Sequence, residues 1–483
     1  MIKTVETLLL SFRKHFSREG CFKWFVVAVF ALMLRGDRLG VTSVIRDLDL
    51  SHKCYENLLH FFRSKAFSLS SLREQWYITV RDNTMLHRVN GRTVLVGDGV
   101  KQSKEALKMP GVKKMVQESE TCSKKQYIHG HLFGQIGIII TNMRSRYCLP
   151  LKSSIQDGLR SMAGWPEAKG IMEISDKSHV EQIIESAFEA AKVFGDSYLL
   201  LDRYFLSRPA LVLLDALNGK LGQPGKDLVV MITKAKSNCN AYRHPRRKSG
   251  SKGRPPRKGK SVKLAELFSQ KRFFTETTVM MYGVEEAISY YCLNLLWGQK
   301  LYRELRFVLV SYRGKRAILV STDTSLDPLT IISLYSTRFS IEETFREFKQ
   351  QIGGFCYHFW TKSLPKLNHF AKKGTDLLEG IIDSASRTKI VETARAIETF
   401  VFCASVALGA LQIIALDKRH GFEVIASRYL RTYSKDDPSE ASVMYYLRKK
   451  VFLILSRNPH SFITEYIREK QMWGFEEYEA KAG

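Results

Sequence analysis

The sequence has no pair of cysteines at C-x-x-C spacing, and no cysteine stands at zinc-ligand spacing from a histidine. Its eight cysteines are scattered along the chain from Cys21 to Cys403. Structural zinc sites need such pairs, and disulfide-stabilised secreted domains need a denser set of cysteines. We therefore expect reduced thiols in a cytoplasmic protein.

Apolar runs long enough to cross a membrane are also lacking. Trp24–Leu34 is short, and Phe400–Leu416 is interrupted by Ser405, Gly409 and Gln412. A membrane-spanning helix needs about 20 predominantly apolar residues. The first residues show no apolar core of a signal peptide. Trp24–Leu34 is too short to cross a bilayer and Phe400–Leu416 is predicted to be a buried core helix, so we expect a soluble protein with no membrane partner.

Acidic residues are few relative to basic ones. The 483 residues include 75 Lys and Arg but 48 Asp and Glu, a net charge of +27. Such an excess is unusual for an enzyme of small metabolites and typical of a protein that neutralises many phosphates. With 45% hydrophobic and 11% aromatic residues, the chain is not disordered. Nucleic acid is therefore the expected partner.

The hydrophobic pattern divides the chain into segments of different character. Residues 1–80 show helical spacing and are predicted to be a helical, DNA-binding domain, and residues 356–483 are predicted to be mostly helical. Residues 85–233 and 301–355 alternate short apolar strands with helices, which predicts an α/β core with a mixed sheet. A β-rich insertion is predicted over residues 234–300.

A strongly basic segment lies within the predicted insertion. Residues 243–260 contain nine Lys and Arg and no acid, with three Pro and three Gly. Such a composition cannot bury a core and predicts a mobile arm. Contact with DNA phosphates is its expected use, and Arg246, Arg247 and Arg254 are candidate contacts.

One predicted helix carries an unusual set of polar side chains. It begins at Asp327 and runs to about Gln351, with Asp327 as the cap and Pro328 in its first turn. At 100° per residue, five side chains that can handle phosphate or metal share about 80° of arc. These are Tyr335, Arg338, Glu342, Arg346 and Lys349. Glu343 lies off this face, and the alternative is an ordinary charged helix surface.

Two aspartates each follow a short apolar strand. Asp98 ends RTVLVGD and Asp202 ends SYLLLD. Reactive groups of α/β proteins lie at such strand ends, although a turn or cap residue is the alternative for each. Together with Glu342 they make three carboxylates, a set that can hold two Mg²⁺ or Mn²⁺ ions.

These residues resemble a known family. Tyr335, Arg338, Glu342 and Lys349 match the Y-x2-R-x3-E-x6-K signature of bacterial insertion-sequence transposases with a DDE active site. The GDG around Asp98 and the LLLDRYF around Asp202 resemble the contexts of the family's two catalytic aspartates. The 140 residues between Asp202 and Glu342 leave room for the β-strand insertion that the family carries.

The resemblance implies a ribonuclease H-like core that cleaves and joins DNA at transposon ends by a cut-and-paste route. Asp98, Asp202 and Glu342 would be the catalytic, metal-binding residues, with two Mg²⁺ or Mn²⁺ ions per site. The Tyr, Arg and Lys of the signature would contact DNA phosphates, and Trp297 of the insertion is a candidate to hold a flipped base. The partners would be transposon-end and target DNA and a second copy of the chain, a homodimer in the synaptic complex.

Two other interpretations stay open. A DNA-binding protein derived from a transposase, without catalytic activity, would have the same charge and the same resemblance. A ribonuclease or resolvase nuclease on a similar core would not require the Tyr-Arg-Glu-Lys helix or the insertion.

Overall fold

The computed structural model describes residues 1–37, 40–104, 106–117, 126–245, 254, 256–368, 370, 376–420, 424 and 437–472. Two compact units are distinguished, and each is described by itself. The helical unit comprises Met1–His87, Gly99–Gln182 and Glu342–Gly483, and the strand-rich unit comprises Arg88–Asp98 and Ile183–Ile341. Both helices and a mixture of parallel and antiparallel strands are present, which confirms the predicted α/β class.

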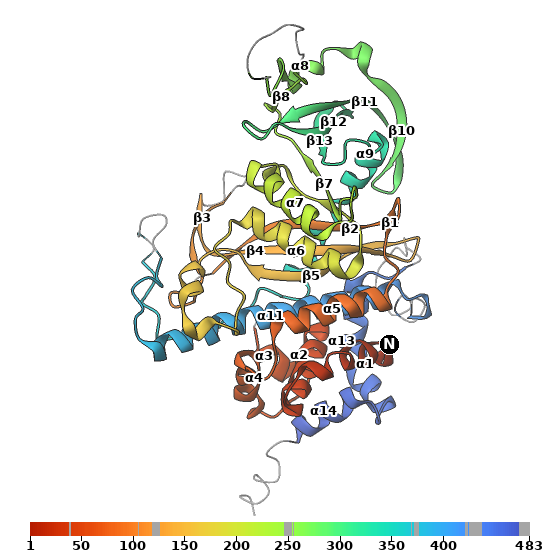
Figure 1. Ribbon diagram of the computed structural model, residues 1–483. Helices are drawn as coiled ribbons and strands as arrows, with labels where there is room; N and C mark the ends of the chain where they lie inside the picture. Colours follow the sequence, from red (N-terminus) through yellow and green to blue (C-terminus); the bar gives the residue numbers. More distant parts are fainter. Residues whose placement is uncertain are drawn as a thin grey trace, which may run out of the picture. The chain divides into compact units, whose positions relative to one another are not determined.

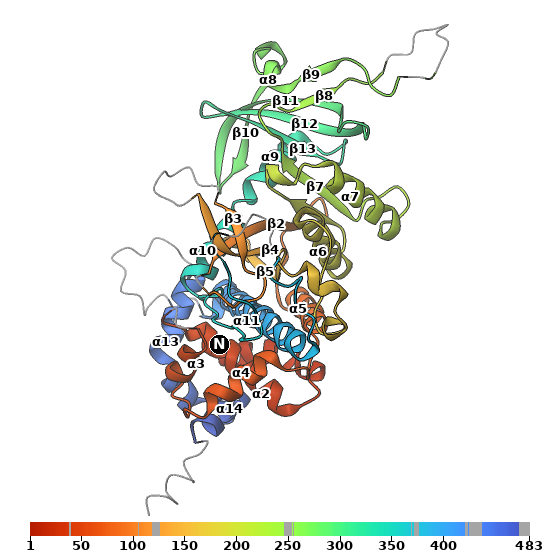
Figure 2. The ribbon, with the colours of Figure 1, turned by 90° about the vertical axis from the view of Figure 1, so that its left-hand side faces the viewer.

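Most helices of the helical unit come from the two ends of the chain. Those before the first strand are α1 (Ile2–Leu10), α2 (Glu19–Leu34), α3 (Thr42–Asp47), α4 (Cys54–Arg63) and α5 (Leu69–Asn83). The later ones are α10 (Ser340–Gln350), α11 (Ser384–Leu416), α13 (Glu440–Arg457) and α14 (Phe462–Gln471). Short 3₁₀ turns lie at Arg13–His15, Arg160–Gly164 and Pro166–Ala168. Figures 1 and 2 both show α11 beside α2, α4 and α13, and contacts join these helices.

The long helix α11 is the central element of this unit. It is long and apolar enough to cross a membrane, yet 94% of its most apolar stretch is buried inside the protein. It also carries Arg395 and Glu398, both nearly inaccessible to solvent. Glu398 accepts a hydrogen bond from Arg73 of α5 at 3.0 Å. The prediction that Phe400–Leu416 is part of a core helix is confirmed.

Three antiparallel strands complete the helical unit. They are β3 (Lys113–Val116), β4 (Tyr127–Thr141) and β5 (Arg146–Ile155). β4 pairs with β3 through Tyr127–Gly130 and with β5 through Phe133–Thr141, where the register shifts at Ile136 and Gly137. The run Ile138–Ile140 is fully buried. The β4–β5 hairpin packs on α11, which explains why its strands are apolar over most of their length.

The strand-rich unit contains the remaining strands. They are β1 (Arg88–Val89), β2 (Arg92–Ser103, to Asp98 in this unit), β6 (Ser197–Leu200), β7 (Val229–Lys234), β8 (Asn240–Tyr242), β9 (Ser261–Lys263), β10 (Thr275–Met281), β11 (Val284–Trp297), β12 (Arg303–Tyr312) and β13 (Lys315–Ser321). Their order is β2-β6-β7-β13-β12-β11-β8-β9, with β1 on β2 and β10 on β11. β2, β6 and β7 are parallel, whereas the other pairings are antiparallel.

The helices of this unit are α6 (His179–Phe194, from Ile183 in this unit), α7 (Arg208–Leu221), α8 (Leu264–Leu267) and α9 (Pro328–Thr337), with 3₁₀ turns at Arg203–Phe205 and Lys271–Phe273. Strands β12 and β13 form an antiparallel hairpin. Its turn residues Arg313 and Gly314 have φ of 46° and 73°, the left-handed pair of a type I′ turn.

The two units divide the chain differently from the four predicted domains. The N- and C-terminal helices share one unit because α2 and α11 are both buried and pack on each other. The predicted β-rich insertion continues the sheet, because β11 pairs with β12 along most of its length. Figure 2 shows β8 and β9 beside β11 at the far end of this series of strands.

Candidate active site

The register between two parallel strands brings Asp98 and Asp202 side by side. In the β2–β6 ladder, Val94 pairs with Tyr198 and Val96 pairs with Leu200. Every pair has the same offset of 104 positions, which is also the separation of the two aspartates. The ladder ends at Val96 and Leu200, two residues before Asp98 and two residues before Asp202, so both aspartates follow paired positions. Adjacent strands lie about 4.8 Å apart, and residues two positions on project to the same face.

Backbone contacts keep the chain extended as far as Asp202. The amide of Leu201 donates to the carbonyl of Ile232, and the Thr233 hydroxyl donates to the carbonyl of Asp202 at 2.8 Å. The chain then turns through the 3₁₀ turn at Arg203–Phe205, where Phe205 is buried. Asp202 therefore ends an extended segment that is held against β7, and its side chain remains half-exposed.

Two residues of the signature, Tyr335 in helix α9 and Arg338 directly after it, lie near Asp98. The first turn of α9 is capped by Asp327, whose carboxylate accepts from the Thr330 amide at 2.8 Å, as predicted. At its other end, Nη2 of Arg338 lies 2.5 Å from Oδ2 of Asp98. The two side chains are 12% and 20% exposed. Arg338 and Asp98 thus form a largely buried ion pair within the strand-rich unit.

The same charged groups affect the pKa of Tyr335. Burial raises the pKa of its phenol, the Arg338 guanidinium lowers it, and the carboxylates of Asp202 and Asp98 raise it. A phenol so affected remains protonated near neutral pH and can donate a hydrogen bond. Tyr335, Arg338, Asp98 and Asp202 are therefore neighbours in one unit.

The prediction of a single helix from Asp327 to Gln351 is wrong. Helix α9 ends at Thr337, and α10 begins at Ser340. Around the interruption, the amide of Arg338 bonds to Tyr335 and the amide of Ile341 bonds to Arg338, both over three residues. These tight turns break the 100° progression, so the predicted common face does not extend from Tyr335 to Lys349.

The other signature residues lie on α10, in the helical unit. Glu342 and Arg346 are exposed and Lys349 is half-buried, and Nε of Arg346 lies 3.1 Å from Oε1 of Glu347. The Thr344 hydroxyl donates to the carbonyl of Cys148 in β5 at 2.7 Å. This contact turns Thr344 inward, and the neighbouring Glu342 and Glu343 are both exposed to solvent.

The structure describes only some of the candidate DNA-binding residues of the insertion. Arg246 and Arg247 lie outside the described residues, whereas Arg254 is described and exposed. The ends of the predicted arm are paired: the amide of Arg243 bonds to Lys260, and Nζ of Lys258 lies 4.2 Å from the centre of the Tyr242 ring. At its ends, therefore, the segment continues the β8–β9 hairpin.

Trp297 ends β11 and is half-buried. Its indole N–H donates a hydrogen bond to the thiol of Cys239, whose pKa is raised by burial and lowered by this bond. The side chain thus has a partner inside the strand-rich unit, and its prediction as a base-holding residue stays a prediction.

The acidic residues present an incomplete metal site. Among the residues that the structure describes, no three His, Cys, Asp or Glu side chains are grouped closely enough to hold a metal ion. Asp98 and Asp202 would supply two neighbouring carboxylates, but one oxygen of Asp98 is held by the Arg338 guanidinium. In this conformation the residues do not fit a two-ion centre.

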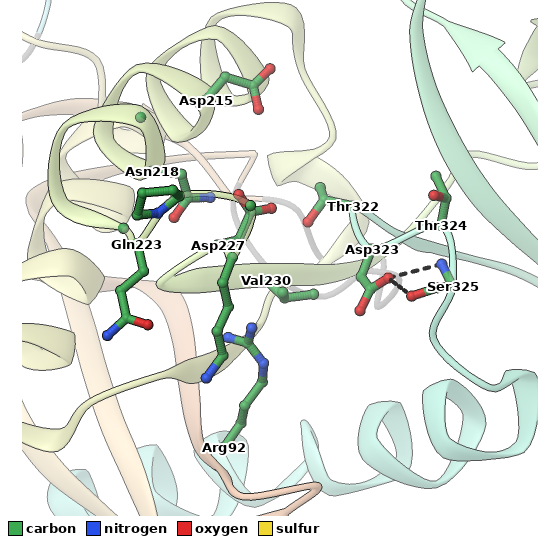
Figure 3. A pocket seen from close by; sticks show the side chains of 15 residues that line it. Arg92, Asp215, Asn218, Gln223, Asp227, Val230, Thr322, Asp323, Thr324 and Ser325 are labelled. Carbon is green, nitrogen blue, oxygen red and sulfur yellow. Dashed lines mark hydrogen bonds between the residues drawn. The ribbon is translucent and has the colours of Figure 1, made fainter.

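A cavity of 790 Å³ lies elsewhere in the strand-rich unit (Figure 3). The carboxylates of Asp215, Asp227 and Asp323 and the guanidinium of Arg92 surround it. Burial raises the pKa of Asp215, and Arg303, 2.8 Å away, lowers it. Arg92 begins β2 and Asp227 precedes β7, so the cavity lies at the amino ends of the parallel strands. Reactive groups of α/β sheets lie toward the opposite end, where Asp202 follows β6. The prediction that Asp98 ends its strand is wrong, because β2 continues through Asp98 to Ser103.

The fold and the site define a mixed α/β protein with two aspartates just beyond the parallel β2–β6 ladder, Asp98 within β2 and Asp202 after β6. Comparison with protein-family models finds no match, and comparison with curated proteins finds none either. The Arg338–Asp98 ion pair is the feature that sequence reasoning missed. The two residues are 240 positions apart, and no local pattern marks them as partners.

Proposed function

We propose that the protein is a DDE transposase of the insertion-sequence type. It would cleave DNA at transposon ends and transfer the strands into target DNA, with Mg²⁺ or Mn²⁺ as cofactor. Asp98, Asp202 and Glu342 are the proposed catalytic residues. The core would be ribonuclease H-like, a type of α/β core for which the parallel strands β2, β6 and β7 and the antiparallel β4–β5 hairpin are suitable components.

One observation carries the proposal. Arg338 bonds to Asp98, and the charges of Asp98 and Asp202 raise the pKa of Tyr335, although helix α9 and strand β2 are far apart in sequence. A charged helix surface without function would not need an inward-facing Arg and Tyr at an acidic pair. The proximity of Arg338 to these aspartates supports a phosphate-binding site, since guanidinium groups bind phosphates through charge-assisted hydrogen bonds.

The charge of the chain supports DNA as the substrate. A net charge of +27 favours binding to a polyanion whose affinity falls steeply with salt. The exposed Arg254 and the basic residues around it would contribute contacts that do not depend on DNA sequence. Arg346 and Lys349 on α10 are further proposed phosphate contacts, and a homodimer on DNA is the proposed assembly.

The test is single-turnover cleavage of duplex DNA that carries the repeats flanking the gene, with Mg²⁺ and the full chain. Asp98→Asn, Asp202→Asn and Glu342→Gln should each abolish cleavage and leave DNA binding intact. The matched controls are Asp227→Asn, at the amino end of the strands, and Glu343→Gln, the exposed neighbour of Glu342. Both controls should cut like the parent.

Three results would change the assignment. Specific binding to the repeats without cleavage by the parent chain would favour the non-catalytic DNA-binding protein. If Glu343→Gln does not cleave DNA while Glu342→Gln cleaves it normally, the third catalytic carboxylate is that of Glu343 and not that of Glu342. Cleavage by Asp98→Asn or Asp202→Asn at the parent rate would remove that residue from the catalytic set.

A further inference from the structure

The carboxyl of Glu440 is buried where four elements of the helical unit meet. Glu440 begins α13 and is 8% exposed. Gln412 of α11 and Tyr147 of β5 each form a side-chain hydrogen bond with it, and Glu347 of α10 contributes a second carboxylate. We call these four residues the Glu440 cluster. The beginning of α13 is thus joined to three other elements by polar side chains that are largely shielded from solvent.

The hydrogen-bond donors of the Glu440 cluster do not suffice for its acceptors. The Tyr147 hydroxyl donates to the carbonyl of Pro438 at 3.2 Å, and its single hydrogen cannot also be donated to Glu440. Oε1 of Gln412, a residue that is 1% exposed, and Oε2 of Glu347 are buried and have no hydrogen-bond partner within the described part of the chain. Buried acceptors without a donor cost free energy, so the cluster lacks a hydrogen.

A proton on Glu440 would supply this hydrogen. A protonated carboxyl donates as well as accepts, whereas a carboxylate only accepts. Burial raises the pKa of Glu440 to about 7, the bond from its own amide lowers it, the Glu347 carboxylate raises it, and the bonds with Gln412 and Tyr147 lower it. The carboxyl therefore gains and loses its proton near neutral pH.

The charged and titratable groups that face the Glu440 cluster are mostly acidic. Nε of Arg346, a 56% exposed side chain of α10, lies 3.1 Å from Oε1 of Glu347. Helix α11 contributes the neutral amide of Gln412. The others are Glu343 and Glu347 of α10, Asp437 before α13 and the phenol of Tyr147, whose pKa burial raises. A further negative charge at Glu440 is therefore unfavourable in this place.

We propose that Glu440 is a proton switch for the docking of α13: with the proton bound, Tyr147 donates to the Pro438 carbonyl and holds the start of the helix on β5, whereas loss of the proton turns the Tyr147 hydrogen to the Glu440 carboxylate and frees that carbonyl. The deprotonated carboxylate also repels Glu347, which loosens α13 from α10. The inference does not depend on the proposed function, because it concerns packing within the helical unit.

The direction of the pH dependence follows from the two states of Glu440. Its pKa is about 7 in the folded chain and about 4.3 in an unfolded one. Between these values the docked form binds a proton that the open form does not, so docking is most stable at low pH and weakens as the pH rises toward 7. The equilibrium constant for opening the first turn of α13 should increase about 40-fold between pH 5 and pH 7.

The first test records infrared difference spectra of the full chain between pH 5.5 and pH 8.5. The parent should show a protonated-carboxyl band that disappears at the higher pH. Glu440→Gln, which keeps a donor and an acceptor but does not titrate, should lack this band. Tyr147→Phe should keep the band and shift its frequency, because the carboxyl loses a hydrogen-bond partner.

The second test measures amide hydrogen exchange of the peptide that covers residues 440–447 at pH 5 and pH 7. The ratio of the parent's exchange rate to that of Glu440→Gln should rise about 40-fold between the two pH values, because the intrinsic exchange chemistry cancels. The matched control is Ser439→Ala. It removes the 3.2 Å cap bond to the Ser442 amide in the same turn without removing a titratable group, and its exchange ratio to the parent should stay constant.

The proposal is overturned if the parent shows no protonated-carboxyl band that disappears in this interval, a result that needs no variant. It is equally overturned if folded Glu440→Gln keeps the band, or if its exchange ratio to the parent is the same at pH 5 and pH 7. A change of similar size in Ser439→Ala would also refute it, because any weakening of the turn would then produce the effect.

Discussion

His131 should make the helical unit sensitive to mild acid. It lies on β4 with no exposed surface, and its two ring nitrogens have partners: Nδ1 is 2.6 Å from the Tyr357 hydroxyl and Nε2 is 2.8 Å from the carbonyl oxygen of Pro110. A carbonyl can only accept, so Nε2 carries the proton and Nδ1 accepts from Tyr357. A second proton on the ring would break the bond from Tyr357.

Burial lowers the pKa of His131 to about 3, the bond to Pro110 raises it, and the nearby Lys104 ammonium lowers it further. In the unfolded chain the pKa is about 6.5. Below pH 6.5 the unfolded chain therefore binds a proton that the folded chain does not, and stability falls as the pH falls toward 3. Between pH 7 and pH 4.5 this amounts to about two pKa units, or about 2.7 kcal/mol.

The perturbation is His131→Gln, whose amide can still donate to Pro110 and accept from Tyr357. The variant should be less stable than the parent at pH 7 because its fit is poorer. Its deficit should shrink by about 2.7 kcal/mol at pH 4.5, because Gln does not titrate. Urea unfolding at both pH values, followed by tryptophan fluorescence, measures the deficit.

A His131→Gln deficit that stays constant between pH 7 and pH 4.5 would refute the reasoning. It would mean that the ring accepts a proton in the folded state and that the buried network rearranges around it.

Three further predictions concern the core, the cap of α9 and the basic arm. Glu398→Leu removes the buried one of the two carboxylates that bond to the guanidinium of Arg73 and should cost about 3 kcal/mol in urea unfolding, whereas Arg73→Met with Glu398→Leu should cost much less; equal losses would show that the pair is not coupled. Asp327→Ala removes the cap bond to Thr330 and should cost about 1 kcal/mol, and a thermal melt like that of the parent would contradict it. Neutralising four arm residues should make the log–log salt slope of DNA binding shallower by about 0.9 for each DNA phosphate that the arm no longer neutralises, and an unchanged slope would show that they do not touch DNA. These residues are Arg246, Arg247, Lys248 and Lys252.

Much of the secondary structure follows from local patterns. The short apolar runs RTVLVGD and SYLLLD predicted strands that the structure contains as β2 and β6. These predictions succeed because the two strands are buried over their apolar residues. The prediction that Asp327 caps the helix is also confirmed, because its hydrogen-bond partner Thr330 is only three residues away.

The helix interruption at Arg338 could not be predicted in this way. The residues around it suit a continuous helix, and no Pro or Gly marks a break. Arg338 instead lies against Asp98, a contact over 240 positions that no local pattern contains. The grouping of the N- and C-terminal helices is a similar case, because α11 buries its polar residues against partners from the other end of the chain.

The candidate site was predicted residue by residue, but its assembly depends on one register. At the amino ends of β2 and β6, the amide of Thr93 donates to the carbonyl of Asp196, and the hydroxyls of Thr93 and Ser197 lie 2.7 Å apart. Both side chains are fully buried, so a shift of one residue would leave these hydroxyls without each other and turn the apolar residues of β2 to the wrong face. The same shift would send the Asp98 side chain to the opposite face from Asp202. A buried polar pair five residues before each aspartate thus sets the two carboxylates side by side, which neither strand specifies by itself.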